Sequence, residues 1–248
     1  MQHLVKEPGF EHAVKWVLPQ IDYREFCNEL LQVKDKDTFQ RKIMAPFLEM
    51  LAAKTTSGVS SEGLERVDKS KAYTFITNHR DIVLDTSFLN LCFLRTDYPT
   101  TQVAIGNNLL IYEWINDLVR LNKSFIVKRD LPRVKALEAA KELSEYIHYT
   151  VGTENQSVWI AERQGRSKDS SDMAQDSLIK MLALAGDKDF LGNIAEINLL
   201  PVSISYEYDP NDYLKAREFL LRRNDPEFKK SQRDDLFAME TGLLSPKG

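Results

Sequence analysis

A histidine follows a short run of β-branched and aromatic residues in the stretch Thr74-Phe-Ile-Thr-Asn-His-Arg-Asp-Ile-Val-Leu-Asp85. The run has the composition of a buried strand, and Asp81 suits the N-cap of an apolar helix over residues 82–94. Imidazole titrates near neutral pH, so His79 at this junction is a candidate general base. Asp81 and Asp85 are the carboxylates available to orient its ring. Taken alone, the histidine has an alternative role, which is to satisfy backbone groups at a strand end.

Polar and basic residues also end three further predicted strands. Residues 106–109 read Gly-Asn-Asn-Leu, residues 128–130 read Lys-Arg-Asp, and residues 162–167 read Glu-Arg-Gln-Gly-Arg-Ser. Paired cations beside a glycine, which lets the backbone approach closely, describe a site for a phosphate group. Singly, each segment could equally be a solvated turn or an exposed loop with internal ion pairs.

Together with the histidine, these segments describe a base beside an anion clamp, which suits the deprotonation of a hydroxyl on a phosphorylated substrate. The candidate substrate-binding residues are Asn108, Lys128, Arg129, Glu162, Arg163, Gly165, Arg166 and Ser167. Neither a metal ion nor a cofactor is required by this chemistry.

The positions of the four segments follow from an alternation of strands and helices. Strands are predicted at residues 72–77, 102–105, 124–128, 157–161 and 198–206, and helices at 82–95, 111–120, 133–149 and 177–185. Strands separated by helices of this length are typical of an α/β fold, here a mostly parallel mixed sheet flanked by helices. Ligands of such sheets bind beyond the carboxyl ends of the strands, where the polar segments fall.

Residues 1–65 are predicted to form an N-terminal helical subdomain that precedes an α/β domain over residues 66–248. Phe39, Ile43 and Phe47 recur on one helical face, and Pro46 predicts a kink. The small polar residues of 55–63 are predicted to link the two parts.

The composition bounds the class of protein. A chain of 248 residues that is 43% hydrophobic can bury a large core, and its net charge of −4 argues against bulk attraction to nucleic acid. No apolar run reaches the length of a membrane span, and the N-terminus lacks an export-signal pattern, so a cytoplasmic protein is expected. Cys27 and Cys92, far apart in the sequence, indicate neither a disulfide framework nor a metal site.

The order of the motifs resembles that of the glycerolipid acyltransferases, the family that acylates glycerol-3-phosphate, dihydroxyacetone phosphate or lysophosphatidate. The matching segments are Asn78-His79-Arg80 with a following aspartate, Ser124 to Arg129, Glu162 to Ser167, and Leu200 to Tyr206, in which Pro201 takes the place of the proline near the family's pocket. Residues 104–109 are also similar to a segment of the branch that acylates glycerol-3-phosphate. The resemblance covers about residues 70 to 210.

This resemblance implies an acyltransferase that moves a fatty acyl group from acyl-CoA or acyl carrier protein to a phosphorylated glycerol acceptor. His79, held by Asp85 or Asp81, would take the proton from the acceptor hydroxyl, which then attacks the thioester carbonyl. The basic residues of the clamp would contact the acceptor phosphate.

A lipid product also implies peripheral contact with the inner face of the cytoplasmic membrane, through apolar side chains near the crevice and basic residues. The basic candidates are Arg222, Arg223, Lys229 and Lys230. Acidic residues are interleaved with them, so a solvated helix surface is the alternative.

Three departures from the family pattern limit what transfers. Leu84 occupies the position where the family has its aspartate. Residues four apart share a helical face, so Asp85 is predicted to point back toward His79, while Asp81 is predicted to cap the helix. The third motif, residues 162–167, has one extra residue. Lys128 replaces an arginine, which keeps the charge but loses the planar fork.

Other functions remain open at this point. The acceptor could be a different lipid, such as an amino-acid lipid, or the chain could bind phospholipid or acyl carrier without catalysis. A serine hydrolase is disfavoured, because the sequence lacks a Gly-x-Ser-x-Gly elbow and residues 58–62 place glutamate where the second glycine should be.

Overall fold

The computed structural model describes residues 1–163, 165–168 and 171–248. Within them, five strands form one sheet in the order β3-β2-β4-β1-β5. The strands are β1 (Thr74–Thr77), β2 (Gln102–Gly106), β3 (Ser124–Val127), β4 (Val158–Ala161) and β5 (Leu199–Val202). Every described strand pair is parallel. The predicted α/β class is confirmed, with a sheet that is parallel throughout where a mixed one was expected.

Helices cover both faces of the sheet because side chains alternate between the faces along each strand. Ile76 and Ile160 point into a cluster with helices α7 (Arg133–Gly152) and α8 (Asp176–Leu182). Phe75 and Trp159, their neighbours, point into a second cluster that includes Phe93 of α5 (Leu84–Arg95). Helix α6 (Glu113–Leu121) connects β2 to β3. These four helices lie where the sequence predicts them.

The N-terminal residues are helical, as expected. Their elements are α1 (Pro8–Val17), α2 (Tyr23–Gln32), α3 (Lys36–Phe39), a π-helical segment (Gln40–Met44) and α4 (Ala45–Thr55). The π-helical segment ends just before Pro46, which has no N–H to continue a regular ladder. Phe10 packs against Trp114 of α6, and Leu51 packs against Phe88 of α5. The N-terminal helices therefore share hydrophobic clusters with the α/β part of the chain.

Three helices were not predicted: α9 (Phe190–Glu196), α10 (Asp212–Asn224) and α11 (Gln232–Leu244). Helix α10 lacks an apolar stripe, because the residues that it buries are Lys215 and Glu218, which are held by ion pairs. Hydrophobic periodicity in the sequence does not predict such a helix.

The predicted strand over residues 198–206 ends early. Strand β5 stops at Val202, because the Asn78 side chain takes the place of a neighbouring strand. Its amide accepts from the Ile204 N–H at 2.8 Å and donates to the Ile204 carbonyl at 2.9 Å.

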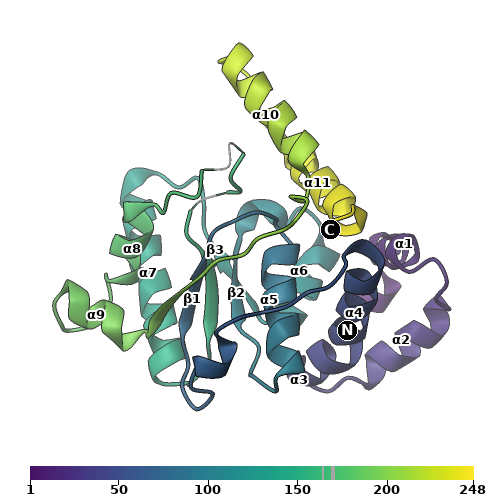
Figure 1. The fold of residues 1–248 in the computed structure, drawn as a ribbon, viewed down its shortest axis with the longest axis horizontal. Helices are drawn as coiled ribbons and strands as arrows, with labels where there is room; N and C mark the ends of the chain where they lie inside the picture. The colour runs from purple at the N-terminus through teal and green to yellow at the C-terminus, as the bar shows by residue number, and fades with distance from the viewer. Residues whose placement is uncertain (164, 169–170) are drawn as a thin grey trace.

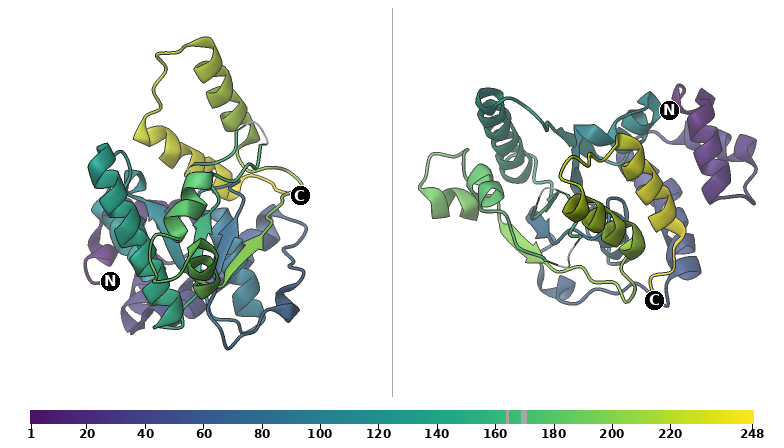
Figure 2. Two further views of the ribbon diagram at one scale, coloured as in Figure 1. Left: turned by 90° about the vertical axis from the view of Figure 1, so that its left-hand side faces the viewer. Right: turned by 90° about the horizontal axis from the view of Figure 1, so that it is seen from above.

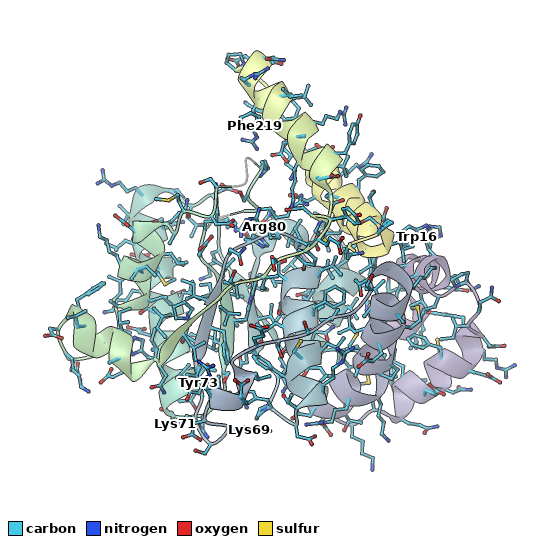
Figure 3. All side chains as sticks on the ribbon, in the orientation of Figure 1. Trp16, Lys69, Lys71, Tyr73, Arg80 and Phe219 are labelled. Atoms are coloured by element: carbon cyan, nitrogen blue, oxygen red, sulfur yellow. The ribbon has the colours of Figure 1, made fainter. Side chains whose placement is uncertain are left out.

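Helices α10 and α11 lie over the carboxyl edge of the sheet. In Figure 3, Tyr73 marks the lower edge, before β1, and Arg80 marks the upper edge, after it, on the side where α10 stands. Figure 2, seen from above, shows both helices lying across that edge. The end of the sheet at which parallel folds bind ligands is therefore faced by the last two helices (Figure 1). No helix in the described ranges is both long enough and apolar enough to span a bilayer.

Candidate active site

His79 and Asp85 form a buried hydrogen-bonded pair between the end of β1 and the first turn of α5. Nδ1 of His79 lies 2.9 Å from Oδ2 of Asp85, and the side chains are 10% and 0% exposed. An ionised carboxylate only accepts hydrogen bonds, so Nδ1 carries the proton and Nε2 carries the lone pair. The Trp159 ring stands edge-on to the imidazole, with centroids 6.2 Å apart. The ring is thereby fixed in a tautomer that can act as a base.

The Asp85 carboxylate is fully engaged. Oδ2 also accepts the backbone N–H groups of Arg80 and Asp81, at 2.8 and 3.0 Å. Oδ1 accepts the Tyr206 hydroxyl at 3.0 Å. Burial and the Asp85 charge raise the pKa of Tyr206 well above its usual range, so the phenol stays a donor. Four donors stabilise a charge that would otherwise be costly to bury.

Asp81 has a different role. Its Oδ1 accepts the N–H groups of Val83 and Leu84, both at 2.9 Å, and its Oδ2 accepts from Asn211 at 3.1 Å. These are capping contacts, although α5 begins at Leu84, two residues later than the sequence suggested. Burial, and then the nearby Asp85 charge, raise the pKa of Asp81. The structure thus gives the histidine contact to Asp85 and the capping contact to Asp81.

The Arg129 side chain lies against Gly106, the last residue of β2. A Cβ added at Gly106 would lie 2.6 Å from Nε of Arg129 and 2.3 Å from Oδ1 of Asn108, so a larger residue there would displace both side chains. Asn107 anchors the same turn by accepting the Arg129 N–H at 2.9 Å. Burial lowers the pKa of the Arg129 guanidinium, and the Asp235 carboxylate opposes that shift. A cation is therefore held over the strand end, within the electrostatic influence of the Asp235 and Asp130 carboxylates.

Arg166 is the most buried of the candidate cations, at 6% exposure. Its Nη2 lies 3.7 Å from Oδ1 of Asp235, and its Nη1 has no hydrogen-bond partner among the described residues. Ser167, the next residue, donates its N–H to the His79 carbonyl at 2.9 Å. Arg166 is thus held beside the histidine with part of its guanidinium unsatisfied. A buried cation with spare donors is suited to an anionic ligand.

Two of the remaining candidates of the third segment, Arg163 and Ser167, have structural partners, whereas Oε1 of Glu162 is buried without a hydrogen-bond partner among the described residues. Arg163 donates to the Ser171 carbonyl at 3.0 Å, and Ser167 donates its hydroxyl to the same carbonyl at 2.6 Å. Burial and the Asp172 charge raise the pKa of Glu162. Gly165 has φ +79°, a backbone conformation that favours glycine.

Two candidates, Lys128 and Pro201, lie in settings that do not support a substrate contact. Lys128 is exposed and paired with Glu142 of α7 at 2.8 Å. Pro201 lies on the edge strand β5, opposite Ile76, where its missing N–H is tolerated. It is not among the described residues that line the cavity below.

A cavity of about 1200 Å³ opens at the carboxyl edge of the sheet. Its polar lining includes His79, Asn108, Lys128, Arg129, Arg163 and Arg166. Its apolar lining comes from β3, β4, α7 and α8, and includes Phe125, Ala139, Leu143, Ile160, Leu178 and Met181. One space therefore joins a histidine base, cations and an apolar wall.

Several site residues escaped the sequence reasoning. They are Trp159, Lys168, Tyr206, Glu218, Lys230 and Asp235. Lys168 had a signal, since it directly follows the third basic segment. Tyr206 ended the fourth matching segment and Lys230 was a candidate for membrane contact, but neither was placed at this site. Trp159, Glu218 and Asp235 are brought there by β4 or by the segments after β5, and nothing local in the sequence marks them.

A buried His–Asp pair faces a cation-lined cavity at the carboxyl edge of a parallel sheet, an arrangement whose chemistry is suited to a general base acting on an anionic substrate. The family model described as acyltransferase matches residues 58–205, more than half of the chain. The chain therefore belongs to the acyltransferase family, the glycerolipid acyltransferases, which indicates acyl transfer to a lipid acceptor. A comparison with curated proteins found no match.

Proposed function

We propose that the protein transfers a fatty acyl group from an acyl thioester, acyl-CoA or acyl carrier protein, to a hydroxyl of glycerol-3-phosphate or lysophosphatidate. The observation that carries the proposal is the buried contact between His79 and Asp85 on a cavity that also presents Arg129 and Arg166. A base and an anion site in one cavity suit a substrate that carries both a hydroxyl and a phosphate.

The proton steps follow from the tautomer. Nε2 of His79 takes the proton of the acceptor hydroxyl as its oxygen attacks the thioester carbonyl. The tetrahedral intermediate collapses, the ester forms, and the thiolate leaves and takes the proton back from Nε2. Asp85 stays ionised throughout and stabilises the imidazolium between the two transfers.

The apolar part of the cavity suits the acyl chain. Phe125, Leu143, Leu178 and Met181 line it between the sheet and helices α7 and α8. Burying methylene groups there would contribute about 0.8 kcal/mol for each CH₂ removed from water. The same wall would keep bulk water from the thioester, which disfavours hydrolysis over transfer.

The acceptor phosphate is assigned to Arg129 and Arg166. Both guanidiniums line the cavity, and Asp235 is a charge partner of each. A phosphate beside them would compete with this single carboxylate. Lys128 is engaged with Glu142, so the two arginines carry this part of the proposal.

Discrimination between acceptors tests the assignment. We expect the wild-type protein to acylate glycerol-3-phosphate or lysophosphatidate and to use glycerol, which has no phosphate, far less well. Arg129→Met removes a charge-assisted hydrogen bond worth roughly 1.5–3 kcal/mol, so kcat/KM for the phosphorylated acceptor should fall by about 10- to 100-fold. The KM for the acyl donor should change little.

Arg133→Met is the matched control, because Arg133 is exposed at the start of α7 and is not among the described residues that line the cavity. Arg166→Met gives a second, independent variant of the same site. Equal loss for glycerol and for the phosphorylated acceptor would contradict the assignment. Efficient use of an amino-acid lipid in place of both would identify another acceptor class.

We also propose that the protein binds peripherally to an anionic membrane surface through α10 and α11. Tyr213, Leu220 and Phe237 are exposed there, at 74%, 44% and 57%, and Arg223 is exposed on the same helix as Tyr213 and Leu220. Exposed apolar side chains with a neighbouring cation suit the headgroup region of a bilayer. Arg222, by contrast, is paired with Glu218 at 3.0 Å.

Sedimentation with anionic phospholipid vesicles at low ionic strength tests this proposal. We expect Tyr213→Ser/Leu220→Ser to lower the bound fraction, because about 2 kcal/mol of transfer free energy is lost for each large apolar side chain. Leu191→Ser is the matched control, since Leu191 is 74% exposed on α9. The proposal is wrong if the wild-type protein stays in the supernatant, or if both variants bind equally.

A further inference from the structure

A second group of cations lines the cavity, and the segment from α10 to the residues just before α11 supplies most of it. Glu218 of α10 lies at its centre, within 3.6 Å of Lys168, 3.0 Å of Arg222 and 3.2 Å of Lys230. All four residues line the same cavity as His79. We call Lys168, Arg222 and Lys230 the rim cluster.

The rim cluster has more positive than negative charge. Lys230 also pairs with Asp235, which in turn contacts Arg166. The three cations of the rim cluster and Arg166 together face two carboxylates, those of Glu218 and Asp235. An excess of two positive charges therefore remains. Burial lowers the pKa of Lys168, and so do the nearby charges of Lys230, Arg166 and Arg222, while Glu218 opposes them. An incoming anion would relieve this crowding.

The cations lie at different depths. The side chain of Arg166 is 5% exposed, whereas those of Lys230, Lys168 and Arg222 are 18%, 23% and 55% exposed. Helix α10, which carries Arg222 and Glu218, stands clear of the sheet in Figures 1 and 2. The rim cluster therefore occupies the outer part of the cavity, and Arg166 the inner part beside His79.

We infer that the rim cluster binds the phosphate of a 4′-phosphopantetheine arm, the group that acyl-CoA and acyl carrier protein share. The inference rests on the proposed function. In a glycerol phosphate the hydroxyl and the phosphate are close together, so its phosphate belongs near His79, with Arg129 and Arg166. In the donor, the whole pantetheine unit separates the thioester from the phosphate, and the carrier beyond it must stay outside. That phosphate belongs at the rim.

The chemistry of the rim cluster suits such a phosphate. Lysine ammonium groups bind a phosphate group as mobile point charges, and a guanidinium adds directed donors. Glu218 holds the three side chains in place when no donor is bound, because it contacts each of them. Helix α10 would thereby help to bind the acyl donor, a role that its sequence pattern does not suggest.

Calorimetric binding of unreactive thioether analogues tests the inference without any turnover. The ligands are an acyl-CoA analogue, the corresponding acyl-4′-phosphopantetheine analogue, and an acyl-pantetheine analogue that has no phosphate. We expect Lys168→Met/Lys230→Met to weaken the two phosphorylated analogues by about tenfold or more and to leave the third unchanged. The affinity for glycerol-3-phosphate should also be unchanged.

Lys229→Met is the matched control, because Lys229 is an exposed neighbour that is not among the described residues lining the cavity. Equal weakening of all three analogues, or of none, would overturn the inference. Loss for the CoA analogue alone would assign the cluster to the nucleotide instead, and loss for glycerol-3-phosphate alone would assign it to the acceptor. If the wild-type protein binds the phosphorylated analogues as expected but acylates no acceptor, the proposed function fails and the phosphate site stands.

Discussion

Replacing Asp85 with asparagine is expected to lower kcat for acyl transfer by about 10²- to 10⁴-fold while the protein stays folded. The asparagine oxygen can occupy the present position of Oδ2 and accept the same N–H groups from His79, Arg80 and Asp81. Its amide nitrogen then faces the Tyr206 hydroxyl, which can accept as well as donate. The position and the tautomer of the His79 ring are retained. The variant loses only the negative charge that stabilises the imidazolium.

Steady-state kinetics and thermal unfolding of the same preparation separate the two effects. We expect a large fall in kcat, little change in the KM for either substrate, and a similar Tm. Asp85→Ala would be a poor test, because it leaves four buried donors without an acceptor and would destabilise the fold. Unchanged turnover in Asp85→Asn would remove Asp85 from the mechanism.

Asp81→Ala is the matched comparison, since it removes the neighbouring buried carboxylate. It should cost about 1 kcal/mol of unfolding free energy, the ordinary loss of a helix cap, and should keep most of the turnover. The reason is that Asp81 binds the N–H groups of Val83 and Leu84 and the Asn211 amide rather than the imidazole. If the two variants behaved the other way round, Asp81 would be the residue that serves His79.

The local part of the site could be predicted from the sequence because it depends on short-range geometry. Asp81 comes just before the helix and Asp85 lies in its first turn, which already distinguishes a capping carboxylate from one that points back to the preceding turn. Moving the helix start from Ile82 to Leu84 does not change this, because the cap binds the same N–H groups. The alternation of strands and helices likewise predicted the sheet and the edge that carries the site.

The parts that were missed depend on contacts between distant segments. Tyr206 was placed in a strand, but β5 ends at Val202, and the chain then carries the phenol to Asp85. Lys128 was chosen for its charge at a strand end and for its place in the second motif, but Glu142 on the following helix pairs with it. Helix α10 buries Glu218 among cations in place of an apolar face. Hydrophobic periodicity carries no information about such pairings.

His79→Gln is expected to have the largest effect of any substitution in the site. Glutamine is polar and of similar size, so it can fill the buried place beside Trp159 and still donate to Asp85. Its amide cannot take a proton at neutral pH, and the acceptor hydroxyl would have to attack without a base. General-base catalysis contributes about 10²- to 10⁴-fold, so turnover should fall by at least that much.

The most direct test follows the transfer of a labelled acyl group from an acyl thioester to glycerol-3-phosphate or lysophosphatidate, with wild-type protein and His79→Gln side by side. Calorimetry on the same samples measures acceptor binding. We expect an acylated, phosphorylated product with the wild-type protein, a rate at least about 10²-fold lower with His79→Gln, and equal acceptor binding by both. The proposed function is contradicted if the wild-type protein acylates neither acceptor, or if His79→Gln transfers the acyl group at the wild-type rate.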